Sequence, residues 1–177
     1  MDLSARPQAI HPDIAIPCPT SFKLTSPTLI EGEFLPTEHT ADGGNISPQL
    51  RWENPPVGTE SFLLTCFDPD APTPSGWWHW CVVDIDASVY ELVSGAGASD
   101  LELEGAAFHL RADHGEASYF GAAPPKGDRE HRYVFTLYAL DVPTLHVDDE
   151  ASIAMAIFLA NEHVLGRASI TVFYQQK

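Results

Sequence analysis

The chain has 177 residues, 44% of them hydrophobic, and a formal net charge of −16, which suits one globular domain with a substantial core. The acidic balance disfavours nucleic acid as a partner, because such binding depends on neutralising phosphates with lysine and arginine. It disfavours an anionic membrane surface for the same reason, and the apolar runs are far too short to span a bilayer.

Residues 1–20 are polar and rich in proline, which predicts an N-terminal arm attached to a single domain at 21–177. The arm has no basic stretch followed by an apolar one, so no secretory signal is expected. Cys18, Cys66 and Cys81 form an odd, widely spaced set that is typical of free thiols in a reducing compartment. These features predict a cytoplasmic protein.

Short β-forming stretches separated by proline and glycine fill most of the domain. Many strands, few helices and no regular alternation of the two favour a mainly β fold, with two antiparallel sheets in a Greek-key arrangement and one or a few peripheral helices. The predicted strands are 22–26, 50–53, 61–67, 77–85, 105–111, 131–140 and 168–174.

One helix is predicted late in the chain, where apolar residues recur at helical spacing. Asp148 or Asp149 is the expected N-cap, and Gly166 is the expected end of the helix. The apolar positions are Ile153, Ile157, Ala160 and Val164.

The stretch FDPDAPTPSGWWHW combines two aspartates, three prolines and a histidine among tryptophans. In a strand that begins at Trp77, alternation places Trp77, His79 and Cys81 on one face. His79 then needs a polar partner, because a buried group left unsatisfied costs roughly 1–3 kcal/mol. Asp68 and Asp70 are the expected partners, and a carboxylate beside the ring would raise the pKa of His79. The alternative is a satisfied core histidine with turn aspartates and no ligand.

A second stretch, YFGAAPPKGDREHRYVF, has a glycine on each side of a proline pair. Backbone N–H groups of such a loop can cradle an anion. In the strand that follows, His131 and Tyr133 face one way and Arg132 the other. The pattern predicts a small pocket of imidazole, phenol and backbone donors for a phosphate or carboxylate. The alternative is a strand that starts with an exposed histidine and a packed tyrosine.

Four motifs occur in order: GGNISPQLRW (43–52), DPDAP (68–72), GWWHW (76–80) and GAAPPKGDREHRY (121–133). Together they resemble the signatures of the phosphatidylethanolamine-binding protein family, and the compact chain is similar to its bacterial and archaeal, Raf-kinase-inhibitor-like branch. The resemblance implies a Greek-key pair of sheets with a pocket for phosphate-like groups. Carried over residue by residue, the ligand-binding positions are Asp68, Pro72, Trp77, His79, Gly121, Pro125, His131 and Tyr133, with Asp70 in support.

The chain departs from the usual family pattern in this second loop. Ala122 and Ala123 stand where many members have glycine, which restricts the approach of the backbone to a ligand. Asp128 and Glu130 add negative charge near the expected mouth of the pocket.

We therefore expect a small-ligand binding protein whose pocket accepts phosphoethanolamine or another phosphorylated or carboxylated compound. The resemblance also implies an alternative, an inhibitor or regulator that acts on a kinase or protease through its surface, and it implies a homodimer. The sequence has no GxSxG, HExxH or EF-hand pattern and no histidines at metal-ligand spacing. It therefore predicts no catalysis, no metal and no cofactor.

Overall fold

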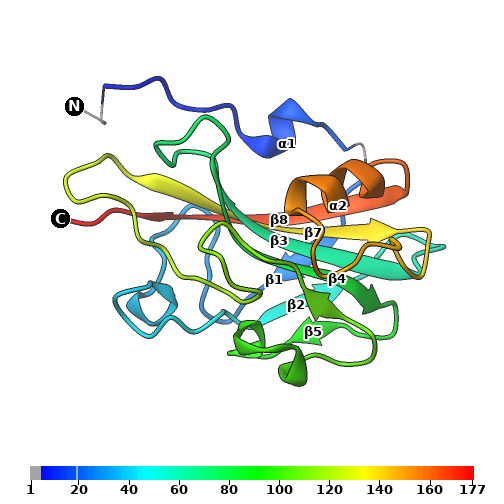
Figure 1. The fold of residues 1–177 in the computed structure, drawn as a ribbon. Coiled ribbons are helices and arrows are strands. Elements are labelled where there is room, and N and C mark those ends of the chain that lie inside the picture. The colour runs from blue at the N-terminus through cyan, green and yellow to red at the C-terminus, as the bar shows by residue number, and fades with distance from the viewer. Residues whose placement is uncertain (1–4, 19) are drawn as a thin grey trace.

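Two antiparallel sheets form the protein in a computed structural model that describes residues 5–18 and 20–177 (Figure 1). The larger sheet has the strand order β6-β4-β3-β7-β8, and the smaller sheet has the order β1-β2-β5. This architecture confirms the predicted mainly β fold. The strands are β1 (Lys23–Thr25), β2 (Leu50–Glu53), β3 (Ser61–Asp68), β4 (Trp77–Asp86), β5 (Glu91–Leu92), β6 (Phe108–His109), β7 (His131–Leu140) and β8 (Val164–Tyr174).

Strands β2, β3, β4 and β7 lie within one residue of their predicted ranges. Strand β1 is one residue shorter at each end than predicted, and β8 begins four residues earlier. The stretch 131–140 is a strand over its whole predicted length, and 61–67 extends by one residue to Asp68. The stretch 105–111 contains only the two-residue strand β6, and β5 was not predicted. Two-residue strands carry too little alternation to be seen in a sequence.

The described residues form few helices, and these lie outside the sheets. They are α1 (Pro12–Ala15), α2 (Ile153–Ala160) and three 3₁₀ helices at Thr37–His39, Ala96–Ala98 and Asp100–Glu102. The predicted bounds of the late helix are wrong. Ser152 is its N-cap, because the Ser152 hydroxyl accepts the Met155 N–H at 3.2 Å. Gly166 belongs to β8, whose apolar residues extend the apparent helical pattern beyond the true C-cap, Asn161.

The core has two parts, one on each face of the larger sheet. Large side chains such as Trp52, Phe62 and Trp80 fill the space between the two sheets. On the opposite face, Ile153 and Ala156 of α2 pack in a second cluster. Figure 1 shows α2 and the smaller sheet on opposite sides of the larger sheet.

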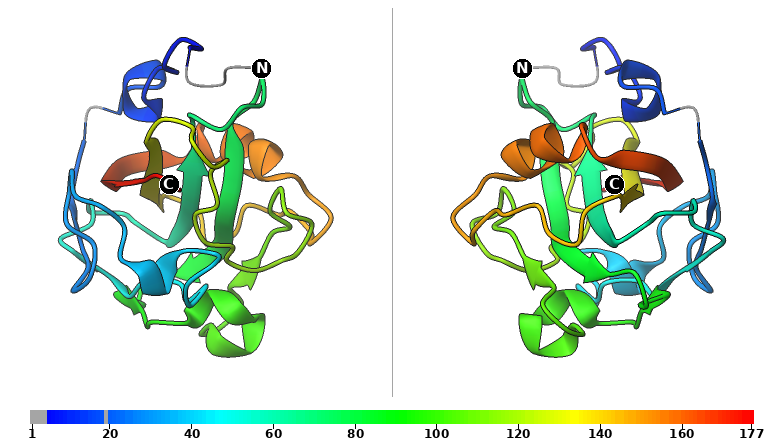
Figure 2. Two further views of the ribbon diagram at one scale, coloured as in Figure 1. Left: turned by 90° about the vertical axis from the view of Figure 1, so that its left-hand side faces the viewer. Right: turned by 90° about the vertical axis from the view of Figure 1, so that its right-hand side faces the viewer.

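The outer edge of β8 is hydrogen-bonded to an earlier segment of the chain. Gly32 donates its N–H to the Thr171 carbonyl at 2.9 Å, and Leu35 donates to the Phe173 carbonyl at 2.7 Å. Phe173 in turn donates to the Glu33 carbonyl at 2.9 Å. Residues 20–35 therefore run along the β8 side of the larger sheet, as Figure 2 shows.

The predicted N-terminal arm is described at 5–18 and 20, whereas residues 1–4 and 19 lie outside the described residues. It runs along one face of the larger sheet, from Arg132 at the start of β7 to Ser169 in the middle of β8 (Figure 1). Ser169 donates its hydroxyl to the Asp13 carboxylate at 2.7 Å, and Arg132 donates to the Ala9 carbonyl at 2.7 Å. None of the described helices is long and apolar enough to cross a membrane.

Gly76, which connects the proline loop to β4, provides a test of how tightly that loop is packed. Gly76 has a φ of +70°, and a Cβ there would lie 2.4 Å from the Phe67 ring. Gly105 has nearly the same φ, +69°, with no atom within 4 Å of its Cβ position. We expect Gly105→Ala to lower the free energy of unfolding by about 1 kcal/mol through backbone strain. Gly76→Ala should lower it by roughly 1–3 kcal/mol more through overpacking. Equal losses in urea denaturation would show that the packing at Gly76 is unimportant.

Candidate ligand-binding site

A cavity of about 210 Å³ lies beside the two proline loops, where β3 ends and where β4 and β7 begin. Phe120 and Pro124 add apolar surface to its walls. Seven of the eight residues predicted for the pocket line it: Asp68, Pro72, Trp77, His79, Pro125, His131 and Tyr133. The two stretches singled out in the sequence therefore meet in space.

His79 reaches the cavity because β4 contains a bulge at this residue. The β3–β4 register jumps from Trp80 to Trp78 and leaves His79 without a paired residue on β3. Bulges redirect side chains and are frequent beside functional sites. The predicted shared face of His79 and Cys81 is wrong, because the bulge interrupts alternation. Cys81 packs in the cluster below α2, whereas His79 packs edge-on against Tyr133, with ring centroids 5.1 Å apart.

The hydrogen bond that orients His79 comes from a backbone carbonyl. Its Nδ1 lies 2.7 Å from the Phe120 oxygen, and a carbonyl can only accept, so Nδ1 carries the proton. Burial lowers the pKa of His79 despite this hydrogen bond and the nearby charge of Asp68. The neutral ring therefore keeps a lone pair on Nε2, which makes no hydrogen bond with any other described residue. The predictions that an aspartate holds His79 and raises its pKa are wrong.

His131 takes the carboxylate that was predicted for His79. Its Nδ1 lies 2.7 Å from Asp68 Oδ2, and its Nε2 lies 3.1 Å from Asp128 Oδ2. Burial opposes a charge on this ring, but the hydrogen bonds and charges of Asp68 and then Asp128 raise the pKa of His131. Carboxylates thus flank His131 on both sides and favour its charged form, and neither nitrogen is free for a ligand.

Asp70 joins the first proline loop to β7 through Arg132. The carboxylate accepts from Arg132 Nε at 2.6 Å and from Nη2 at 2.7 Å, a bidentate pair. Burial raises the pKa of Asp70, but the hydrogen bonds and charge of Arg132 outweigh it and lower the pKa overall. The Asp70 N–H also donates to Asp68 Oδ1 at 2.8 Å, so the loop begins in a tight turn. Asp70 does not line the cavity.

Gly121 has a structural role that the sequence did not predict. It does not line the cavity, and its N–H donates to Asn45 Oδ1 at 2.7 Å. A Cβ on Gly121 would lie 2.5 Å from the His39 carbonyl oxygen, so this position requires glycine where two segments cross. The Gly127 N–H also has a partner in the protein, since it donates to the Gln176 carbonyl at 3.1 Å. These two backbone donors therefore do not face a ligand as predicted.

Tyr133 is the second polar group of the cavity without a partner. Its hydroxyl oxygen is buried and makes no hydrogen bond with the described residues. Burial raises the pKa of Tyr133, so the phenol keeps its proton and can donate it. Tyr133 Oη and His79 Nε2 together give the cavity one donor and one acceptor that the protein leaves unused.

Sequence reasoning missed three residues that shape this site. Phe120 acts through its backbone carbonyl, for which no residue pattern exists. Asp128 was noted only as a charge near the mouth, and its distance of three residues from His131 on an extended chain gives no signal of contact. Arg6 of the arm reaches Asp128 from far away in the sequence. Among the described residues, no group of three or more His, Cys, Asp or Glu side chains is placed to hold a metal ion.

The pair of Asp70 and Arg132 should be important for stability. Their side chains are 0% and 10% exposed, so Asp70→Ala leaves a nearly buried guanidinium without its carboxylate. We expect a loss of about 3–5 kcal/mol in the free energy of unfolding. Glu91→Ala removes the partner of Arg51 in an exposed pair and should cost less than about 1 kcal/mol. Similar losses in the two variants would contradict the assigned role of Asp70.

The two cavity histidines should titrate separately. The folded pKa of His131 is raised above the value of about 6.5 in an unfolded chain. Its contribution to stability is therefore fully present below pH about 6.5 and is lost as the pH rises through the folded pKa. NMR of the imidazole nitrogens should show His131 charged and His79 neutral at pH 6.5. Asp68→Asn should lower the pKa of His131 more than that of His79, because Asp68 hydrogen-bonds to His131 and acts on His79 only through its charge. If both rings titrated at the same pH, the different environments assigned to His79 and His131 would be wrong.

A family model described as phosphatidylethanolamine-binding protein matches residues 25–175 of the chain. The UPF0098 protein YbhB of Escherichia coli is 46% identical over 158 residues, which cover 86% of this chain and 99% of that protein. The crystal structure of E. coli YbcL has a TM-score of 0.86 and 43% identity, and the match covers 89% of this chain and 100% of that chain. A homologue from Chlamydia trachomatis has a TM-score of 0.77 at 28% identity, with 89% and 99% of the chains covered. The chain therefore belongs to the phosphatidylethanolamine-binding protein family.

Proposed function

We propose that the protein binds a small molecule by a phosphate-like or carboxylate group, which occupies the cavity between the two proline loops. The observation that carries this proposal is the unused donor and acceptor pair, Tyr133 Oη and His79 Nε2, in a cavity with otherwise mostly apolar walls. A buried polar group without a partner costs free energy, and a ligand that satisfies it recovers that free energy on binding.

An acidic group matches this pair in two ways. In its singly protonated form, its hydroxyl donates to His79 Nε2 while another oxygen accepts from Tyr133. In its fully ionised form, it binds as His79 takes up a proton and becomes a donor. Both routes bring one proton into the cavity, so affinity should rise as the pH falls. His131 was predicted to donate to the anion, but Asp68 and Asp128 occupy its two nitrogens, so we assign it no direct contact with the ligand.

The size and walls of the cavity support a small ligand group. Its volume of about 210 Å³ is below the range of roughly 300–1,000 Å³ that is usual for drug-sized ligands. Pro72, Pro124 and Pro125 give the walls fixed backbone angles. Trp77 and Phe120 reduce contact with water, which strengthens each hydrogen bond formed inside. A head group such as phosphoethanolamine fits this description.

The surface-acting inhibitor remains the alternative from the sequence, and the described residues offer no specific observation in its favour. The homodimer, a partner kinase or protease, the cytoplasmic location and the absence of catalysis stay predictions.

Removing the Tyr133 hydroxyl should weaken binding of inorganic phosphate roughly tenfold, because a hydrogen bond to a charged group contributes about 1.5 kcal/mol or more. The measurement is calorimetry on Tyr133→Phe. Tyr138→Phe is the matched control, since Tyr138 lies on the same strand but packs in the cluster below α2. Equal phosphate affinity in the unmodified chain and Tyr133→Phe would remove Tyr133 from the site.

Dimethyl phosphate serves as a second probe in the same experiment, since it has no proton that titrates near neutral pH. Its affinity should rise as the pH falls through the range in which His79 takes up a proton. A flat profile would exclude His79 as the proton acceptor.

A further inference from the structure

Arg6 of the N-terminal arm lies directly behind the ligand cavity. Its Nη1 lies 2.8 Å from Asp128 Oδ2, and its Nη2 lies 3.2 Å from His131 Nε2. Nη2 also donates to the Asp70 carbonyl. Because His131 lines the cavity, one imidazole ring separates the Arg6 guanidinium from the ligand space.

Asp128 is the group that makes this cation necessary. Its side chain is only 1% exposed, and it places a carboxylate beside His131 on the side opposite to Asp68. Burial raises the pKa of Asp128, but the hydrogen bonds from His131, Arg129 and Arg6 lower it overall, so the group is ionised. Without Arg6, the carboxylates of Asp68 and Asp128 would flank His131 without the guanidinium that now pairs with Asp128. An anion entering the cavity would then meet an excess of negative charge.

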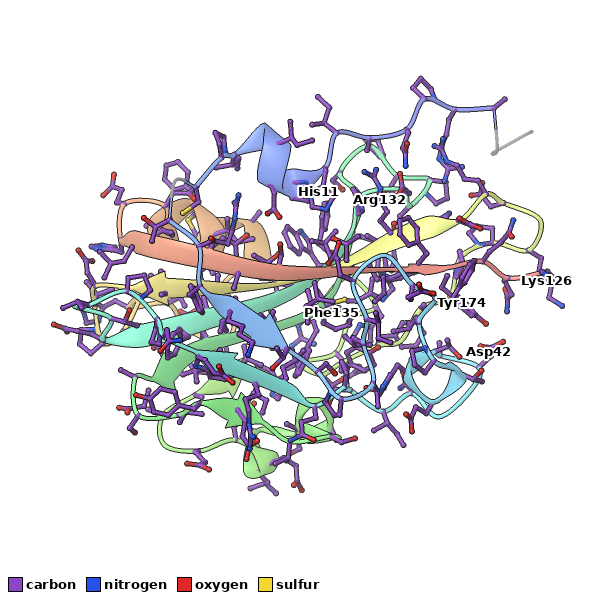
Figure 3. All side chains as sticks on the ribbon, turned by 180° about the vertical axis from the view of Figure 1, so that it is seen from behind. His11, Asp42, Lys126, Arg132, Phe135 and Tyr174 are labelled. Atoms are coloured by element: carbon purple, nitrogen blue, oxygen red, sulfur yellow. The ribbon has the colours of Figure 1, made fainter. Side chains whose placement is uncertain are left out.

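The arm and the cavity also share a wall. Ala71 and Thr73 of the first proline loop line the cavity on one side. The same two residues line a groove that Pro7, Ala9 and Ile10 of the arm help to form. Figure 3 shows Arg132 next to the arm, which agrees with its hydrogen bond to the Ala9 carbonyl. A change in how the arm is held can therefore reach the ligand site through the loop as well as through charge.

We propose that Arg6 is a specificity-determining residue of the ligand site: by neutralising Asp128 behind His131, it makes the cavity able to accept an anion. This inference rests on the proposed function and adds the arm to the binding machinery. Docking of the arm and binding of an anion then favour each other, because a coupling free energy acts equally in both directions.

Charge-changing variants test this role with inorganic phosphate and calorimetry at fixed pH and low salt. Arg6→Gln should weaken phosphate binding by roughly threefold to tenfold, the order expected for one nearby charge in a partly screened site. Arg6→Lys keeps the charge and should stay within about twofold of the unmodified chain. Arg6→Gln combined with Asp128→Asn removes both charges and should restore most of the lost affinity.

Arg51→Gln is the matched control, because it removes one arginine from an exposed pair with Glu91 and changes the net charge equally. It should leave phosphate affinity unchanged. Thermal unfolding of each variant identifies any that fail to fold, and Arg6→Lys then remains as the charge-preserving comparison.

Each possible result has a definite reading. The proposal is supported if Arg6→Gln weakens phosphate binding and the addition of Asp128→Asn restores it. The role of Arg6 is overturned if the unmodified chain and Arg6→Gln bind phosphate equally well. It is also overturned if adding Asp128→Asn weakens phosphate binding further. Either result leaves the proposed function unaffected. No phosphate binding by the unmodified chain overturns the proposed function itself, and this inference with it.

Discussion

Two carboxylates separated by one proline tie β3 to β7, and the site depends on this connection. Asp68 binds His131, and Asp70 binds Arg132, the next residue along the strand. Neighbouring residues of a strand point to opposite faces. Asp68 therefore binds β7 on the face of the sheet that carries the cavity, and Asp70 binds β7 on the face where the arm lies. The proline loop that follows is fixed at its start by both pairs, and this loop forms one wall of the cavity.

The fold could be predicted from the sequence largely because its long strands carry their own signal. The stretch from His131 to Leu140 is bounded by a loop of glycine and proline, and its β-forming residues match the observed strand. The α2 cap was predicted wrongly because several capping residues occur within five positions, and only packing decides which of them starts the helix. The residue pattern also predicted that the two stiff loops and the strands after them form one pocket, whereas the individual cavity residues came from the resemblance to the family.

The pairing inside the cavity could not be predicted, since it depends on geometry that sequence spacing does not contain. The bulge at His79 turns that ring away from the face that alternation assigns to it, toward Tyr133 and the Phe120 carbonyl. Asp68 is then left for His131, which lies 63 residues later in the chain. The contact of Arg6 with Asp128 spans 122 residues and has no local pattern at all.

The chain has only nine lysines and arginines, and several of these lie in the arm or contact it. Arg129 donates to the Pro7 carbonyl, Arg132 donates to the Ala9 carbonyl, and Arg167 pairs with Asp13. Together with Arg6, these contacts hold the arm along the face formed by β7 and β8. The net negative charge of the chain therefore does not describe the electrostatics of this region, where acidic and basic groups alternate at short range.

The segment that covers β8 has a consequence for how copies of the chain can associate. An open strand edge offers unpaired N–H and C=O groups, to which a second molecule can add a strand, and such addition is a common start of aggregation. Here Gly32, Glu33 and Leu35 already bond with the outer edge of β8. At the other end of the sheet, β6 is only two residues long. Addition of strands from a second molecule to the larger sheet is therefore blocked at β8 and limited at β6.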